Sequence, residues 1–99
     1  MIDINQLTGF DWDVGNREKN LQKHRVSTGE CEEVFFNFPL LLQDDTGHSQ
    51  AEPRFLVLGQ TTAGRYLFIA FTIRQKKFRV ISARDMSQKE RVSYEQTNS

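Results

Sequence analysis

A stretch from Arg65 to Arg84, RYLFIAFTIRQKKFRVISAR, most constrains the fold that this chain can adopt. Its first half, Tyr66 to Ile73, is a nearly unbroken run of apolar and β-branched residues. A run of this length and continuity predicts a central strand covered on both faces. A polar break at 74–77 separates it from a second run, Phe78 to Ala83. The pattern therefore predicts an antiparallel β-hairpin.

Arginines bracket or interrupt this hairpin at Arg65, Arg74, Arg79 and Arg84. In the second strand, Phe78 and Val80 should face one side of the sheet, and Arg79 and Ile81 the other. A buried guanidinium without a partner is strongly destabilising in a small domain. We therefore expect Arg79 to reach solvent, a carboxylate or a ligand.

Composition predicts a single globular domain. The chain has 99 residues, 37% apolar and 26% charged, which is enough for one core spanning 1–99, with a lead-in at 1–9 and a frayed tail at 96–99. No apolar run is long enough to cross a membrane, and the N-terminus lacks the pattern of a signal peptide. The single cysteine, Cys31, suits the reducing cytoplasm and is explained by a place on a helix face.

The charges cancel overall but are unevenly distributed. From Glu30 to Glu52 the sequence has six acidic residues and no Lys or Arg, whereas from Arg74 to Arg91 it has seven basic and two acidic residues. This distribution predicts two surfaces of opposite sign. The basic surface could meet phosphate, and either could meet a protein partner.

Capping signals predict three helices. Asp13 can cap a first helix that runs to about His24, and a capping box at 27–30 opens a second helix from Thr28 to about Phe36. A second capping box at 87–90 opens a short C-terminal helix through 95. Lys23 and His24 lie in the last turn of the first helix, where the helix dipole favours cations and protonation of His24. A favourable helix end explains this pair as well as a catalytic role does.

Further strands are expected at 10–12, as a short edge strand, at 40–43 and at 54–60. Together with the hairpin they predict an α+β fold: two N-terminal helices, an antiparallel meander of three or four strands, and a short C-terminal helix. The helices should pack on one face of the sheet, which leaves the other face for function.

The residue inventory suits the handling of a phosphodiester without a metal or cofactor. Motifs for phosphate loops, zinc and serine nucleophiles are missing from the sequence. RNA carries its own nucleophile in the 2′-hydroxyl, so a ribonuclease needs only a base, an acid and cations near the phosphate. Candidates of these types are Lys23, His24, His48, Glu52, Tyr94 and the arginines. The same residues also occur on ordinary solvated surfaces.

The order and spacing of these residues resemble the BrnT family of bacterial toxins. The residues that carry the resemblance are Phe10 to Asp13, Asn20, Lys23-His24, Val26-Ser27, His48-Ser49, Glu52, Arg54, Gly59, Arg65, Thr72, Arg74, Arg79 to Arg84, Glu90-Arg91 and Tyr94. The sequence departs from the family pattern at Asn16, at Arg25 and at Thr28. Arg25 replaces a Gly that would serve as the helix C-cap, which predicts a different helix exit.

The resemblance implies a RelE-like fold, RNA cleavage that inhibits translation, and a cognate BrnA-type antitoxin. That antitoxin is expected to bind operator DNA through a ribbon-helix-helix part, so operator DNA is contacted only through it. An acidic or helical antitoxin segment would cover the basic active face.

The resemblance also implies roles for individual residues. Arg54 and Arg79 would hold the scissile phosphate, Lys23 and His24 would transfer protons, and Glu52 is a competing base or the ion-pair partner of Arg54. Contacts to flanking RNA would come from Arg65, Arg74, Lys77, Arg84 and Tyr94. His48 with Ser49 could brace a loop or meet substrate. Two other readings remain: a module that binds nucleic acid or protein without catalysis, and a degenerate toxin, which the change at Asn16 allows.

Overall fold

The computed structural model describes residues 6–45 and 52–97. Three helices and four strands follow in the order α1 (Val14–His24), α2 (Thr28–Phe36), β1 (Leu41–Asp44), β2 (Arg54–Gln60), β3 (Tyr66–Arg74), β4 (Lys77–Asp85) and α3 (Gln88–Thr97). The strands form one antiparallel meander in the order β1-β2-β3-β4. The α+β architecture that the sequence predicts is confirmed. None of the helices in these two ranges is long and apolar enough to cross a membrane.

The predicted caps start the first two helices. The Asp13 carboxylate accepts a hydrogen bond from the Asn16 amide at the start of α1. At the start of α2, the Ser27 hydroxyl accepts from the Glu30 amide, and the Glu30 carboxylate accepts from the Ser27 amide. Each cap satisfies backbone donors that a helix start leaves unpaired.

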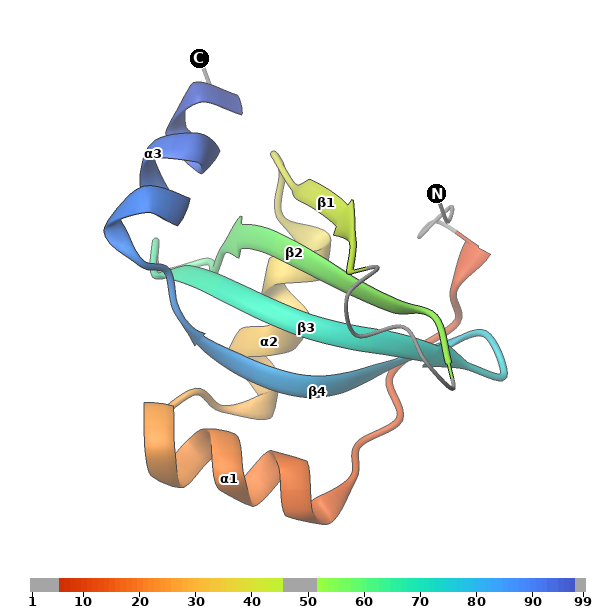
Figure 1. Ribbon diagram of the computed structural model, residues 1–99. Coiled ribbons are helices and arrows are strands. Elements are labelled where there is room, and N and C mark those ends of the chain that lie inside the picture. Colours follow the sequence, from red (N-terminus) through yellow and green to blue (C-terminus); the bar gives the residue numbers. More distant parts are fainter. Residues whose placement is uncertain (1–5, 46–51, 98–99) are drawn as a thin grey trace.

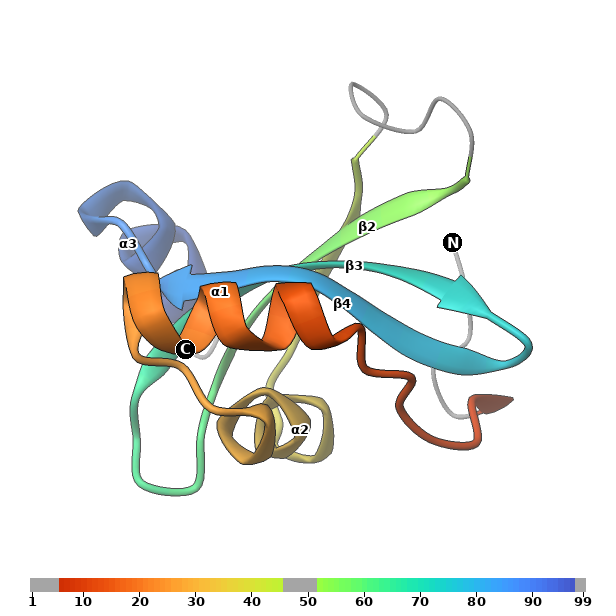
Figure 2. The same cartoon turned by 90° about the horizontal axis from the view of Figure 1, so that it is seen from below.

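The hydrophobic core lies between α2 and one face of the sheet. Alternate residues of the three longer strands point into it, among them Phe55, Val57, Ile69, Phe71 and Val80, and α2 contributes Cys31, Val34 and Phe35. Helix α2 approaches β2 closely at Gly59, where an added Cβ would lie 2.7 Å from the Val34 side chain. Figure 2 shows α2 on one side of the sheet and α3 on the other.

Helix α1 and the segment before it cover the outer edge of β4 (Figure 1). The Asn20 side chain in α1 accepts a hydrogen bond from the Ala83 amide. Further along β4, the Phe78 amide donates to the Gly9 carbonyl, and the Asp11 amide donates to the Phe78 carbonyl. The predicted edge strand at 10–12 is therefore only a single parallel bridge, between Phe10 and Phe78. Residues 6–9, predicted as a lead-in, take part in the same edge, while residues 1–5 lie outside the described ranges.

The expectation that all helices pack on one face is wrong for α3. The Tyr94 ring in α3 packs edge-on against Tyr66, with ring centroids 5.8 Å apart. Tyr66 points to the face opposite the core, because its neighbour Leu67 is fully buried on the core side. Helix α3 therefore covers one end of the second face and continues through Thr97, beyond the predicted start of the frayed tail. Strand β3 is covered on both faces only at that end.

Candidate functional site: the open face of the sheet

A row of three polar side chains crosses the face of the sheet opposite the core. Arg54 on β2 pairs with Thr72 on β3, and Thr72 pairs with Arg79 on β4. Residues paired across neighbouring strands point to the same face, so the three side chains lie side by side. Among the described elements, no helix crosses this part of the sheet (Figure 1). We call this surface the open face.

A β-bulge in β4 brings a second arginine onto the open face. Phe71 pairs with Val80 and Ala70 pairs with Ser82, so Ile81 has no cross-strand partner. The extra residue shifts the alternation, and Arg84 consequently points to the same side as Arg79. The predicted alternation holds for 78–80 and changes after the bulge.

Arg79 is held by two carboxylates from the segment that precedes α1. Its guanidinium nitrogens lie 3.1 Å from an Asp11 oxygen and 3.3 Å from an Asp13 oxygen, and the side chain is 23% exposed. Asp13 is also the N-cap of α1. The requirement that Arg79 find a partner is thus met within the chain, at the rim of the open face.

Two more arginines at this end of the open face, near the turn between β3 and β4, also have acidic partners. Arg54 lies 3.5 Å from Asp45, and Arg74 forms a two-point ion pair with Glu52. The predicted pairing of Glu52 with Arg54 is therefore wrong, because Glu52 reaches across to the end of β3. The hydrogen bond from Arg74 lowers the pKa of Glu52, which keeps this carboxylate ionised.

At the opposite end of the open face, arginines lie on aromatic rings. The Arg84 guanidinium lies 4.0 Å from the centre of the Phe68 ring and forms a two-point ion pair with Glu90, at 2.8 and 2.9 Å. Arg91 lies over the Tyr66 ring at 4.3 Å. The hydrogen bond from Arg84 lowers the pKa of Glu90. Stacked planes of this kind are surfaces on which RNA bases also stack.

Arg65 does not point onto the open face. Its guanidinium donates to the carbonyls of His24 and Arg25 and to the carboxylates of Glu30 and Asp85. The hydrogen bond that Arg65 donates to the Asp85 carboxylate raises the pKa of Arg65 above its ordinary value. We therefore assign Arg65 a structural role in place of the predicted RNA contact. Its N–H groups link the end of α1 to the start of α2 and to the end of β4.

The same contacts explain the exit from α1. Arg25 is the C-cap and has the left-handed conformation, with φ 53°, so the predicted change of helix exit is wrong. A non-glycine residue is strained in this conformation. Arg65 compensates by hydrogen-bonding the exposed carbonyls, and the Arg25 amide donates to the Leu21 carbonyl.

The structure separates the predicted catalytic residues into two groups. Asp13, at the start of α1, contacts Arg79, whereas Lys23 and His24 are exposed in its last turn. Eleven residues of helix place these two ends about 16 Å apart. The His24 end of α1 lies near Asp85 instead, because Arg65 donates to both the His24 carbonyl and the Asp85 carboxylate. Arg65 lowers the pKa of Asp85 most, and His24 adds a smaller effect. The expectation that Lys23 and His24 share one centre with Arg54 and Arg79 is wrong for this arrangement.

The remaining predicted residues have different surroundings. Lys77 is exposed at the start of β4, next to the tight turn at 75–76. Tyr94 is 1% exposed, and its hydroxyl donates to the Pro39 carbonyl at 2.8 Å. This burial leaves no surface for a base, so we replace the predicted RNA contact of Tyr94 by a packing role. His48 and Ser49 lie outside the described residues.

The fold partly neutralises the acidic region 30–52, because Glu30 pairs with Arg65, Asp45 with Arg54, and Glu52 with Arg74. Only the last of these pairs joins the acidic region to the basic region 74–91. Arginines of the basic region pair mainly with other carboxylates, Arg79 with Asp11 and Asp13, and Arg84 with Glu90. These ion pairs reduce the contrast between the two predicted surfaces.

Sequence reasoning missed Asp11, Asp45 and Phe68 as parts of this surface. The Phe10 to Asp13 motif contained a signal, since two aspartates two positions apart in an extended segment point to the same side. Within the described ranges, His, Cys, Asp and Glu side chains form no group of three that could hold a metal ion. Cys31 is buried, and burial raises its pKa to about 12, so it is a core residue.

A family model assigns the chain to one family, and a solved structure shares its fold. A family model described as ribonuclease toxin, BrnT, of type II toxin-antitoxin systems matches residues 12–90. Among solved structures, the crystal structure of the Brucella abortus ribonuclease toxin BrnT aligns with a TM-score of 0.60 and 22% identity, over 82% of this chain and 99% of that chain. At this identity the alignment supports the fold alone. A comparison with curated proteins found no match.

Proposed function

This chain belongs to the BrnT family of ribonuclease toxins of type II toxin-antitoxin systems, and we propose from this premise that it cleaves RNA on the open face of its sheet. The observation that carries the proposal is the row of Arg54, Thr72 and Arg79 across three adjacent strands. Each of the two guanidinium groups offers paired N–H donors, and a phosphate accepts such pairs.

The proposed reaction uses the nucleophile that RNA supplies. A base removes the proton of the 2′-hydroxyl, the 2′-oxygen attacks the adjacent phosphorus, and the bond to the 5′-oxygen breaks as that oxygen takes up a proton. The products are a 2′,3′-cyclic phosphate and a 5′-hydroxyl. No metal enters this scheme, because the guanidinium groups of Arg54 and Arg79 stabilise the charge that develops on the phosphorane.

The ion pairs at the end of the open face that contains Arg79 suggest which residues bind the phosphate and which acts as the base. Arg79 can turn donors from Asp11 or Asp13 toward a phosphate, because its partners are half-exposed and can be resolvated. Glu52 is our candidate base, since its ionised carboxylate pairs with Arg74 at the same end of the open face as Arg79. Arg74 and Lys77 would contact the RNA next to the scissile phosphate.

The second end of the open face would bind flanking nucleotides. Arg84 on Phe68 lies about 13 Å from Arg79, since four residues of β3 separate their cross-strand partners. That distance spans about two nucleotides of extended single strand, and stacking on such planes tolerates any base. Lys23 and His24 lie beyond this end and would contact the RNA there or transfer a proton in a rearranged complex.

A degenerate toxin is the second candidate, and the separation of Lys23 and His24 from Arg79 is the observation that favours it. Such a protein would fold and bind its antitoxin without cleaving RNA. RNA cleavage by the wild-type protein separates the two cases, since only a catalytic toxin has this activity.

The family implies an antitoxin partner. We assign this role to a BrnA-type chain with a ribbon-helix-helix part, so that the complex contacts operator DNA through the antitoxin. We also propose that the toxin acts in the cytoplasm, where both the RNA substrate and the antitoxin would be found, and that it has no membrane partner.

The decisive experiment is cleavage of a long single-stranded RNA by the purified protein in EDTA, beside the same RNA with 2′-deoxy substitutions at the mapped cut sites. We expect cleavage that disappears at the substituted positions and in Arg79→Gln, and that persists in Arg17→Gln, a matched change of an exposed arginine on α1. If folded protein cleaves neither naked RNA nor RNA in a translation extract, the proposal is wrong. Cleavage that survives 2′-deoxy substitution would exclude the proposed mechanism.

A further inference from the structure

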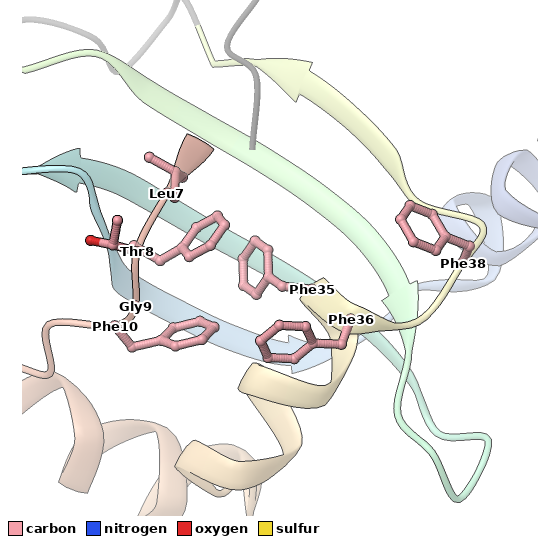
Figure 3. Close-up of a pocket in the computed structure, with 8 residues that line it drawn as sticks. Leu7, Thr8, Gly9, Phe10, Phe35, Phe36 and Phe38 are labelled. Atoms are coloured by element: carbon pink, nitrogen blue, oxygen red, sulfur yellow. The ribbon is translucent and has the colours of Figure 1, made fainter. Parts of the chain in front are cut away.

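Two phenylalanines at the end of α2 are unusually exposed. The side chains of Phe36 and Phe38 are 73% and 77% exposed. They border a cavity of about 380 Å³ whose other walls include Leu7, Phe10, Phe35 and Phe78. Figure 3 shows this groove, with Phe10, Phe35 and Phe36 clustered at its centre. We call it the phenylalanine groove. Clustered exposed aromatic rings around a hollow are typical of protein-binding sites.

The groove has a preformed floor. The Phe10 ring lies 5.6 Å from Phe35, 6.3 Å from Phe36 and 5.0 Å from Phe78. Phe35 and Phe78 belong to the buried core, so the fold fixes the floor of the groove. A partner would therefore fill the groove without having to reorganise it first.

The groove lies on the opposite side of the sheet from the open face. Phe78 points toward α2 and the core, whereas its neighbour Arg79 points to the open face. A ligand in the groove therefore does not occupy the proposed RNA site. The two surfaces can be tested separately.

The charges beside the groove indicate the chemistry of the partner. Helix α2 carries Glu30, Glu32 and Glu33 and has no Lys or Arg. Glu30 is neutralised by Arg65, but Glu32 accepts from the Trp12 indole N–H and Glu33 accepts from the Thr62 amide. Both of these donors are neutral, and no Lys or Arg of residues 6–45 and 52–97 forms an ion pair with Glu32 or Glu33. Within these ranges, two negative charges therefore remain within one helical turn of Phe36. A basic partner segment is complementary to this rim.

We propose that the phenylalanine groove is the docking site of the antitoxin, through a segment with a large apolar anchor flanked by Lys or Arg. This inference rests on the antitoxin partner of the proposed function. It differs from the expectation that an acidic or helical antitoxin segment covers the basic face, because the exposed phenylalanines and the acidic rim of α2 lie on the other side of the sheet. The groove offers the antitoxin both apolar surface and charge that the fold leaves unmatched.

The test is a calorimetric titration of the full-length toxin with the full-length antitoxin encoded in the same operon. We expect the double variant Phe36→Ser/Phe38→Ser to weaken binding at least tenfold. The control is Leu21→Ser, which removes an apolar side chain that is 53% exposed on α1 and should leave the Kd within twofold. Thermal unfolding of each variant verifies the fold. Binding by the double variant within twofold of wild type would overturn the proposal.

A charge variant provides a second measurement. Glu32→Gln/Glu33→Gln keeps oxygen acceptors for Trp12 and Thr62 but removes both charges. We expect weaker binding and a smaller dependence of the Kd on salt than in wild type. An unchanged salt dependence would contradict the basic partner segment. The groove could instead be filled by a second copy of this chain, and sedimentation of the toxin alone tests this alternative. If the wild-type toxin forms dimers and the variant Phe36→Ser/Phe38→Ser does not, the groove is a contact between two copies and the proposal is wrong.

These measurements read binding and do not require RNA cleavage. If the wild-type protein cleaves no RNA but loses antitoxin binding with the phenylalanines, the proposed activity is wrong and the docking site stands. If it cleaves RNA and the double variant binds antitoxin normally, the docking site is wrong and the activity stands.

Discussion

The Arg79 guanidinium donates to the carboxylate of Asp13, the residue that starts helix α1, with an Nη2 to Oδ2 distance of 3.3 Å. The proposed phosphate-binding arginine and a helix cap are thus joined by one ion pair. The pair is partly exposed, with side chains 23% and 42% accessible. Its contribution to stability should therefore be small, while the arginine itself remains available to a substrate.

This arrangement predicts that Arg79→Gln separates activity from stability. We expect RNA cleavage to fall by about 100-fold or more, as for loss of a charged transition-state donor. The free energy of unfolding should fall by about 1 kcal/mol or less, because only half-exposed ion pairs are lost. Urea denaturation and initial cleavage rates measure the two effects. A large loss of stability with normal cleavage would reverse the assignment.

Arg65→Gln should show the opposite pattern. Arg65 bridges the end of α1, the cap of α2 and the end of β4, so its loss frees several hydrogen-bonding groups at once. We expect a loss of about 1 to 3 kcal/mol in the free energy of unfolding, reduced by the partial exposure of the pairs. The matched control is Arg91→Gln, which breaks an exposed pair with Glu95 and a contact with the Tyr66 ring and should destabilise the fold much less than Arg65→Gln. Equal losses in the two variants would refute the bridging role.

The ion pairs of Arg65 and Arg84 predict that the free energy of unfolding falls at acidic pH. Hydrogen bonds from arginines lower the pKa of Asp85 and Glu90 below their ordinary values of 3.8 and 4.5. Burial acts to raise the pKa of Glu30, but hydrogen bonds from the Ser27 amide and Arg65 outweigh it. Carboxylates with lowered pKa bind fewer protons in the folded state, so their stabilisation is present above about pH 4.5 and is lost as the pH falls through the folded values.

The measurement is urea denaturation between pH 3 and pH 7. We expect a plateau at the upper end and a decline below about pH 4.5. Arg65→Gln removes the partner of Glu30 and Asp85 and should make the decline shallower. A wild-type profile that is flat down to pH 3 would show that these pairs do not stabilise the fold.

Tyr94→Phe distinguishes packing from RNA binding. The variant keeps the ring against Tyr66 and loses the hydrogen bond to the Pro39 carbonyl. We expect a loss of about 1 kcal/mol in the free energy of unfolding and no change in RNA affinity. Fluorescence anisotropy with a labelled single-stranded RNA measures the affinity. A marked loss of affinity at unchanged stability would restore the RNA contact that the sequence suggested.

Local sequence signals were sufficient to predict most of the fold. The caps at Asp13 and Ser27 mark helix starts because the partner atoms lie three residues away. The helix ends at His24 and Phe36 were predicted as observed. The apolar run at 66–73 identified the central strand, although α3 covers its second face only near Tyr66.

The candidate site was harder to predict because its contacts are distant in sequence. Glu52 pairs with Arg74 and not with Arg54, which is only two residues away in the sequence. This choice depends on the path of the chain just before β2. The bulge at Ile81 changes which arginines share a face, and composition contains no signal for it. The direction of α1 along β4 separates His24 from Arg79, and only tertiary structure sets this direction.

The neutralised arginines of the open face have a consequence for how quickly RNA is found. A patch of unpaired cations attracts nucleic acid from afar and makes binding strongly dependent on ionic strength. Here Arg54, Arg74, Arg79 and Arg84 each have a carboxylate within 4 Å, and such pairs cancel at distances beyond about 8 to 10 Å in physiological salt. Encounter with RNA is then governed by ordinary diffusion, and selectivity arises only after contact, when phosphates exchange with carboxylates at short range.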